Sequence, residues 1–271
     1  MQYTIDQDGR TLTFRSYSAD DAISRRMRKY NTFYERDLLD YSDSLLAELP
    51  AGGLVVDVGA NFGNHSVYWG AVSERQVVAI EANPALTPFL EANLRNNVPD
   101  GRFTLIAGGA GERSAMGRVR PSDRAPDQFG LAGVEVVDSD ASEKDLFEIH
   151  PLAVWLQRSG LGETPVRLLK IDVEGAEIAV VNGAIPILER DAPEIFAEAS
   201  TRIEREALDI ALAPWGYRRV RRFCSTPTWH YSTERNRLNL WRWRRLGDAA
   251  RLGWRYVKLR HSIVSRMRRA S

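Results

Sequence analysis

Three carboxylates follow one apolar segment of the chain. The run Leu168–Ile171 is followed by Asp172, Glu174 and Glu177 within six residues. A short apolar run of this kind predicts a buried strand, and ligands of α/β sheets bind beside the carboxyl ends of parallel strands. Carboxylates at that place can bind a hydroxyl or take its proton. Lys170 lies one pleat before Asp172 on the same side, so a pair between them would lower the pKa of Asp172.

A second group of residues is typical of a turn around a nucleotide-like ligand. Asp57 closes an apolar run, and Gly59, Asn61 and Gly63 follow at alternate positions. Glycine and asparagine tolerate left-handed backbone and let the chain approach a ligand closely. Glu81 closes the next apolar run, 24 residues after Asp57, where an acid binds ribose hydroxyls in related units. The turn lacks the three-glycine spacing of dinucleotide sites, and an ordinary strand-to-helix loop is the structural alternative.

The elements that must position these residues alternate along the chain. Apolar runs predict strands at 54–58, 77–80, 103–107, 166–171 and 195–199. Helical patterns between them favour an α/β fold with a mostly parallel sheet and helices on both faces. Two further β-like runs, 217–223 and 237–243, predict a C-terminal antiparallel strand pair and bring the sheet to seven strands.

The flanking segments predict a division of the chain into three parts. Residues 1–49 are expected to form an N-terminal hairpin and helical cap, with one helical stretch over 22–49. Residues 50–245 carry the α/β pattern, including a long Gly- and Asp-rich stretch at 108–165 that we expect at the substrate mouth. Another helix is expected at 65–71, and residues 246–271 predict a basic helical tail.

Composition and charge narrow the class of protein. The chain has 271 residues, 44% hydrophobic and 27% charged, which suits one elaborated α/β domain. Cys224 is the single cysteine, which excludes an internal disulfide framework and a cysteine-based metal cluster. No export signal or membrane-spanning run is present, so we expect a cytoplasmic protein.

The charge is distributed unevenly. Residues 218–271 carry a net charge of +14, and the rest of the chain carries −13. Such a basic tail indicates contact with something anionic, and the inner face of a membrane is one candidate. Nucleic acid is a weaker candidate, because the fourth predicted strand is not followed by the Asn-Pro-Pro-aromatic motif typical of enzymes that modify amino groups of nucleic-acid bases. A solvated end is the structural alternative.

Four blocks of sequence identify a family. They are V-V-D-V-G-A-N-F-G-N-H-S-V-Y at 55–68, I-E-A-N-P at 80–84, L-K-I-D-V-E-G-A-E at 169–177 and P-E-I-F-A-E at 193–198. Through them the chain resembles the FkbM family of S-adenosylmethionine-dependent methyltransferases, from about Phe33-Tyr34-Glu35 to Trp243. Two departures concern the acceptor side: Ala82 stands where proline is common, and 138–146 lacks the usual Leu-Asp pair.

The resemblance implies a Rossmann-like class I methyltransferase fold, S-adenosyl-L-methionine as cofactor, and O-methylation of a sugar, glycan or other secondary metabolite. It implies these cofactor-binding residues: Asp57, Gly59, Asn61, Gly63, Asn64, Glu81 and Asn83. For the catalytic side, Asp172 is the first candidate for the base that binds the acceptor, Glu174 the second and His65 the third, with Lys170 as partner of Asp172.

Several alternatives stay open at this stage. Asp172, Glu174 and Glu198 could bind a divalent cation, although nothing in their spacing demands a metal. The chain could be a catalytically inactive scaffold that binds the cofactor, or an RNA-directed methyltransferase that uses the tail. A dehydrogenase is last, for want of the third glycine. The sequence does not specify the oligomeric state.

Overall fold

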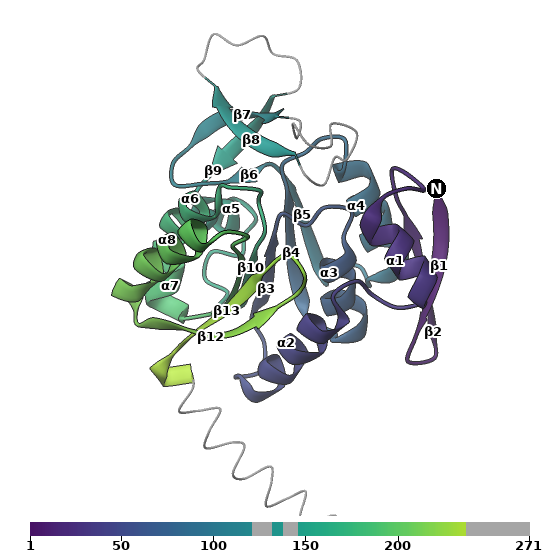
Figure 1. Cartoon of the computed structure of the whole chain (residues 1–271), viewed down its shortest axis with the longest axis horizontal. Helices are drawn as coiled ribbons and strands as arrows, with labels where there is room; N and C mark the ends of the chain where they lie inside the picture. Colours follow the sequence, from purple (N-terminus) through teal and green to yellow (C-terminus); the bar gives the residue numbers. More distant parts are fainter. Residues whose placement is uncertain (121–131, 138–145, 237–271) are drawn as a thin grey trace, which may run out of the picture. The chain divides into compact units, whose positions relative to one another are not determined.

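The computed structural model describes residues 1–120, 132–137 and 146–236. Seven strands within these residues form the central sheet, and their bounds are β3 (Leu54–Val58), β4 (Gln76–Glu81), β5 (Phe103–Ala107), β10 (Val166–Ile171), β11 (Glu194–Glu198), β12 (Tyr217–Phe223) and β13 (Thr228–Thr233). They lie side by side in the order β12-β13-β11-β10-β3-β4-β5 (Figure 1).

The sheet is mostly parallel. β5, β4, β3, β10 and β11 pair in parallel, and β13 runs antiparallel to both β11 and β12. This arrangement confirms the predicted seven-stranded α/β sheet with a C-terminal antiparallel pair. Four of the strands, β3, β5, β10 and β12, have the predicted bounds. Among them, β3 and β10 are central strands, and apolar runs between turn residues are typical of strands buried on both faces.

One member of the antiparallel pair was wrongly predicted. The partner of β12 is β13 at Thr228–Thr233, whereas the predicted run 237–243 lies outside the described residues. The strand was overlooked because it buries polar side chains. His230 and Ser232 are almost fully buried, and both contact the carboxylate of Glu194 on the neighbouring strand, at 2.6 Å and 3.1 Å.

Helices cover both faces of the sheet (Figure 1). On one face lie α5 (Leu152–Arg158), α6 (Glu177–Gly183), α7 (Ile185–Asp191) and α8 (Arg202–Leu212), followed by the short η3 (Ala213–Trp215). On the other lie α2 (Arg36–Glu48), α3 (Asn64–Val67), the π-helix η1 (Tyr68–Val72) and α4 (Thr87–Asn97). The helix predicted at 65–71 is therefore two short elements with different hydrogen-bonding patterns.

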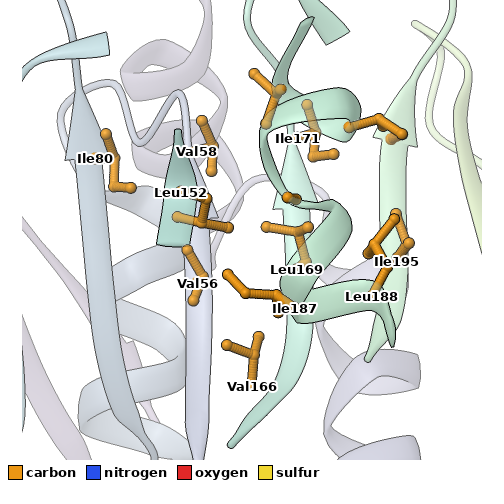
Figure 2. Packing of buried hydrophobic residues seen from close by; sticks show 14 of the residues in the cluster. Val56, Val58, Ile80, Leu152, Val166, Leu169, Ile171, Ile187, Leu188 and Ile195 are labelled. Atoms are coloured by element: carbon orange, nitrogen blue, oxygen red, sulfur yellow. The ribbon is translucent and has the colours of Figure 1, made fainter. Parts of the chain in front are cut away.

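The core between the sheet and α5 to α8 fixes the strands in place. Figure 2 shows Val56, Leu169 and Ile195 from three adjacent strands packed beside Ile187 and Leu188 of α7. Each of these side chains is at most 2% exposed. Full burial of a side chain of this size contributes about 1.5–3 kcal/mol, so this layer holds the strand ends in a fixed relation.

The N-terminal segment is a hairpin of β1 (Gln2–Gln7) and β2 (Arg10–Arg15), followed by α1 (Ala22–Tyr30). The prediction of one helical stretch over 22–49 was wrong, because α1 and α2 are separate helices. Asn31 ends α1 with a φ of 50° and Glu35 precedes α2 with a φ of 58°. Both values are left-handed, which no α-helix continues through. The break places Tyr34 and Glu35 in a connecting segment.

A second sheet arises from the stretch at 108–165. Its strands are β6 (Gly109–Ala110), β7 (Ala115–Arg120), β8 (Gly133–Val137) and β9 (Leu146–His150), in the order β6-β9-β7-β8. In Figure 1 they stand beyond the ends of the central parallel strands. Gly117 packs closely under two side chains, since a Cβ there would lie 2.7 Å from Ile149 and 2.8 Å from Phe147, and these side chains would have to shift.

Met1–Thr233 make up one compact unit, and Glu234–Ser271 make up a second. The predicted basic tail at 246–271 lies outside the described residues. None of the described helices is long and apolar enough to cross a bilayer.

Candidate functional site

A cavity of about 1040 Å³ opens at the carboxyl ends of the central strands. One part of its wall comes from the loops after β3, β4, β10 and β11, and another from the segment around Tyr34 and Glu35. The four-stranded sheet supplies a third, largely apolar part through Val119, Val134 and Ile149. The stretch at 108–165 therefore lines the cavity, as expected of a segment at the substrate mouth.

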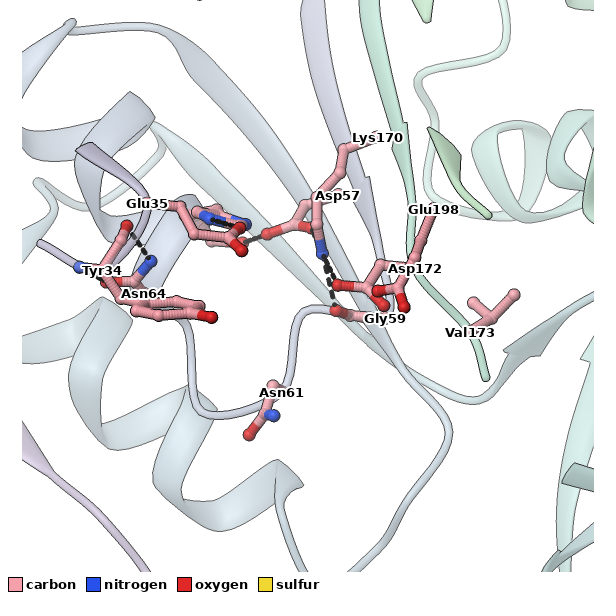
Figure 3. Close-up of polar contacts among 12 residues, drawn as sticks. Tyr34, Glu35, Asp57, Gly59, Asn61, Asn64, Lys170, Asp172, Val173 and Glu198 are labelled. Atoms are coloured by element: carbon pink, nitrogen blue, oxygen red, sulfur yellow. Dashed lines mark hydrogen bonds and ion pairs between the residues drawn. The ribbon is translucent and has the colours of Figure 1, made fainter. Parts of the chain in front are cut away.

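A buried ion-pair chain joins the two main sequence motifs (Figure 3). Lys170 Nζ lies 3.1 Å from Asp57 Oδ1 and 3.4 Å from Asp172 Oδ2, and it donates a hydrogen bond to the carbonyl of Gly59 at 3.0 Å. Ser66 donates to the other oxygen of Asp57 at 2.6 Å. Burial alone would lower the pKa of Lys170, but the two carboxylates outweigh it and raise that pKa. The lysine is therefore a fixed positive charge.

The glycine turn after β3 is pressed against the end of β10. Gly59 has a φ of 79°, and a Cβ at this position would lie 1.7 Å from the carbonyl oxygen of Asp172. Asn61 has a φ of 53°. Gly63, with a φ of 97°, precedes α3 and faces Leu90 rather than the cavity. The turn thus needs its glycines for backbone conformation and for close approach, as predicted.

Glu81 projects into the cavity at the end of β4. Its two carboxylate oxygens accept hydrogen bonds from the backbone N–H groups of Asn61 and Asn83, at 2.7 Å and 2.8 Å. Burial raises the pKa of Glu81, although these two N–H groups counteract the effect. A carboxylate fixed in this way keeps lone pairs for a ligand's hydroxyls.

Three carboxyl groups line the cavity at the ends of β10 and β11. They belong to Asp172, Glu174 and Glu198. Burial acts against ionisation of Asp172, but Lys170 and a hydrogen bond from Glu198 lower its pKa. Burial and the charge of Asp172 raise the pKa of Glu198 to about 9. For Glu174, burial and the charges of Asp172 and Glu177 raise the pKa to about 7. Glu177 itself accepts N–H bonds from Val173 and Gly175 and so holds the loop.

His65 is paired with a residue that the motifs alone did not single out. Its Nε2 lies 3.2 Å from Glu35 Oε2, and both side chains are at least 88% buried. The carboxylate of Glu35 also accepts hydrogen bonds from Tyr34 and Cys224. Burial would raise the pKa of Glu35, but its contacts with His65 first and Cys224 second lower it. The signal that could have found Glu35 is its place at the start of the family resemblance.

Most of the predicted site residues meet at the cavity. Its wall includes these predicted residues: Gly59, Asn61, Asn64, His65, Glu81, Asn83, Lys170, Asp172 and Glu174. Asp57 and Gly63 are not part of that wall. Asp57 is fully buried behind it and acts through Lys170 and Ser66. Asn64 fixes the connecting segment, because its side-chain amide exchanges two hydrogen bonds of 3.0 Å with the backbone of Tyr34.

Within residues 1–120, 132–137 and 146–236, no group of three or more His, Cys, Asp or Glu side chains is arranged to hold a metal ion.

Comparison with known proteins gives the family. The model of the methyltransferase FkbM domain matches residues 57–225, which is more than half of the chain. The chain belongs to the FkbM methyltransferase family. The matched range contains the glycine turn, Glu81, the Asp172 block and Glu198, whereas Tyr34 and Glu35 of the cavity wall lie before it.

Individual relatives of this FkbM chain are distant. It is 25% identical over 197 residues to "Methyltransferase 1" of Beauveria bassiana, covering 62% of this chain and 76% of the relative. The structure of methyltransferase FkbM from Methylobacillus flagellatus is similar at 18% identity and a TM-score of 0.48, over 67% of this chain and 43% of that one. Precorrin-6y C5,15-methyltransferase from Geobacter metallireducens is similar at 16% identity and a TM-score of 0.41, over 72% and 87%.

Proposed function

We propose that this FkbM methyltransferase transfers the methyl group of S-adenosylmethionine to a hydroxyl of a sugar, glycan or other secondary metabolite. The observation that carries the proposal is the division of the cavity wall. Glu81 and the glycine turn line one part, and a group of carboxyls around Asp172 lines another. The first part suits a nucleoside, and the second suits a hydroxyl that must lose a proton.

The residues present fit S-adenosylmethionine. Glu81 is held by two backbone N–H groups and keeps acceptor capacity for the ribose hydroxyls. Gly59 lines the cavity, and its left-handed turn packs backbone against the end of β10, where a side chain would not fit. We assign Glu81, Gly59, Asn61 and Asn83 to the cofactor. When bound, the cofactor supplies an electrophilic methyl group on a positively charged sulfur.

The acceptor requires positioning and a base. An alcohol is a weak nucleophile until its proton is removed, and general bases contribute about 10²–10⁴-fold in such reactions. Asp172 lies at the end of β10 on the cavity wall and is kept ionised by Lys170. We assign to Asp172 the binding of the acceptor hydroxyl. The apolar surface of Val119, Val134 and Ile149 suits a metabolite that also has apolar groups.

The test is methyl transfer from S-adenosylmethionine that carries a deuterated methyl group. The protein is incubated with a panel of monosaccharides, oligosaccharides and hydroxylated polyketides, and mass spectrometry locates the label. We expect label on a hydroxyl oxygen, and a loss of at least about 100-fold in rate for Asp172→Asn. Label on nitrogen, carbon or sulfur would contradict O-methylation, and cofactor binding without transfer to any acceptor would favour the inactive scaffold.

A further inference from the structure

Two carboxyl groups on neighbouring strands face each other at the cavity. β10 and β11 pair in parallel, with Lys170 opposite Phe196 and Ile171 opposite Ala197. Asp172 and Glu198 come next in this register and point to the same side of the sheet (Figure 3). Both side chains line the cavity and lie within hydrogen-bonding reach of each other. Two carboxylates this close repel each other when both are ionised, which favours a state in which the pair shares one proton.

The surroundings explain why the pair keeps that proton. Lys170 is the nearest cation, and it is already engaged by Asp57 at 3.1 Å. The other charged groups that act on the pair include Glu35 from the segment before α2 and Glu174 from the loop after β10. His65 of α3 faces Asp172 but is paired with Glu35. Like charges at short range raise the pKa of one partner, and the pKa of Glu198 is about 9.

Polar contacts fix Glu198 in this position. The hydroxyl of Ser200 donates to its Oε1 at 3.0 Å, and Ser200 also lines the cavity. Glu177 and Glu204 act on the neighbouring Glu174 and add negative charge to the same region. The cavity wall around the pair is therefore short of positive charge, and a cationic ligand would supply it.

We propose that the Asp172–Glu198 pair exchanges its shared proton for the positive charge of the methyl donor, and that the fully ionised pair is the base of the reaction. This inference rests on the proposed function. It makes Asp172 the group that takes the proton and Glu198 the positioning residue that stores it. It also makes the pair the feature by which the site distinguishes the sulfonium donor from its neutral thioether product.

The proton balance of the reaction follows. The hydroxyl oxygen forms a bond to the methyl carbon, the carbon–sulfur bond breaks, and its electron pair stays on sulfur. The O–H proton passes to Asp172, where the pair shares it again. The products are a methyl ether, a neutral thioether and a pair that holds one proton. The thioether product carries no positive charge, so it is compatible with the pair that holds one proton. The pair has then returned to its state before the donor bound.

The test is calorimetric titration of the full chain with S-adenosylmethionine and with S-adenosylhomocysteine at pH 7.5. Buffers of different ionisation enthalpy report the protons released on binding. We expect release of about one proton for the sulfonium ligand and close to none for the thioether. The affinity for S-adenosylmethionine should rise by up to about tenfold per pH unit between pH 7 and 8.5, while that for the thioether stays constant.

Glutamate-to-glutamine variants test which carboxyl group releases the proton. The Glu198→Gln side chain can still donate a hydrogen bond to Asp172 but has no proton to release. This substitution should therefore abolish the difference in proton release between the two ligands. Glu189→Gln, on the exposed side of α7, is the matched control and should keep the difference. Glu174→Gln should retain most of it, since the pKa of Glu174, about 7, leaves that group largely ionised at pH 7.5.

The outcomes separate this inference from the proposed function. Two results would overturn the inference while the cofactor assignment stands. One is equal proton release by the two ligands in the wild-type protein. The other is that Glu198→Gln shows the same difference in proton release between the two ligands as the wild type. Failure of both ligands to bind would overturn the proposed function as well. If Glu198→Gln does not fold, the affinities of the wild-type protein for the two ligands across pH still show whether only the sulfonium ligand releases a proton.

Discussion

Lys170 and Asp57 stand directly opposite each other on adjacent parallel strands, and their charged groups are 3.1 Å apart in the interior. The two residues belong to sequence blocks more than 100 positions apart, and this contact joins the glycine turn after β3 to the carboxyl groups at the end of β10. Lys170 then reaches Asp172 at 3.4 Å. A single buried cation thus fixes the relation between the two parts of the site.

Removing that cation should destabilise the fold. Lys170→Met leaves the fully buried Asp57 without its counterion, and breaking a buried pair in this way costs about 3–5 kcal/mol. Urea unfolding would measure the change in the free energy of unfolding. Lys29→Met, on the exposed face of α1, is the control, with an expected change within about 0.5 kcal/mol. Equal effects of the two substitutions would show that the buried pair has no structural role.

From the close approach of Gly59 to Asp172 we predict that a side chain at position 59 disturbs both binding and stability. Gly59→Ala places a methyl group 1.7 Å from the carbonyl oxygen of Asp172, so either the turn or the end of β10 must move. We expect loss of S-adenosylmethionine binding and a lower melting temperature. Gly101→Ala is the matched control, because Gly101 has a similar φ of 81° but nothing within 4 Å of the added carbon. It should cost only about 1 kcal/mol of backbone strain and leave binding unchanged.

Stability should depend on pH through Glu198. Its pKa is about 9 in the folded protein against 4.5 as the ordinary value, so between these values the folded state holds a proton that the unfolded state has lost. The contribution is fully present below pH 4.5 and is lost as the pH rises to about 9, with a slope of at most about 1.4 kcal/mol per pH unit. Melting curves of wild-type protein and Glu198→Gln at several pH values check this. A variant with the same decline as the wild type would contradict it.

The sequence predicted those parts of the fold in which local pattern and burial agree. The runs of β3, β5 and β10 are mostly apolar and are bounded by turn residues, so their bounds could be read directly. The bounds of β12 were also predicted, between the buried Tyr217 and Phe223. β13 was missed because it buries His230 and Ser232, whose polarity is satisfied by Glu194 only once the sheet has formed. Hydropathy along one strand contains no information about a partner on another.

The candidate site shows the same limit. Asp172, Glu81 and the glycine turn were predicted because their motifs place them at strand ends. Glu35 was not, because its backbone has a left-handed φ of 58° in a stretch with a helical pattern, and its partner His65 lies 30 positions away. The β-sheet from 108–165 was also unresolved, since Gly117 replaces a side chain where Phe147 and Ile149 pack. Long-range packing, rather than local propensity, determines the structure at Glu35 and in the four-stranded sheet.

We propose that Glu81 holds the ribose of S-adenosylmethionine in this cavity, and the most direct test is a titration of wild-type protein and Glu81→Gln with that ligand. We predict saturable 1:1 binding that Glu81→Gln weakens by about 10- to 100-fold, as expected for loss of hydrogen bonds to a charged group. Glu91→Gln, on the exposed side of α4, should bind like the wild type. Absence of binding by the wild-type protein, or equal affinity of the wild type and Glu81→Gln, would contradict the account.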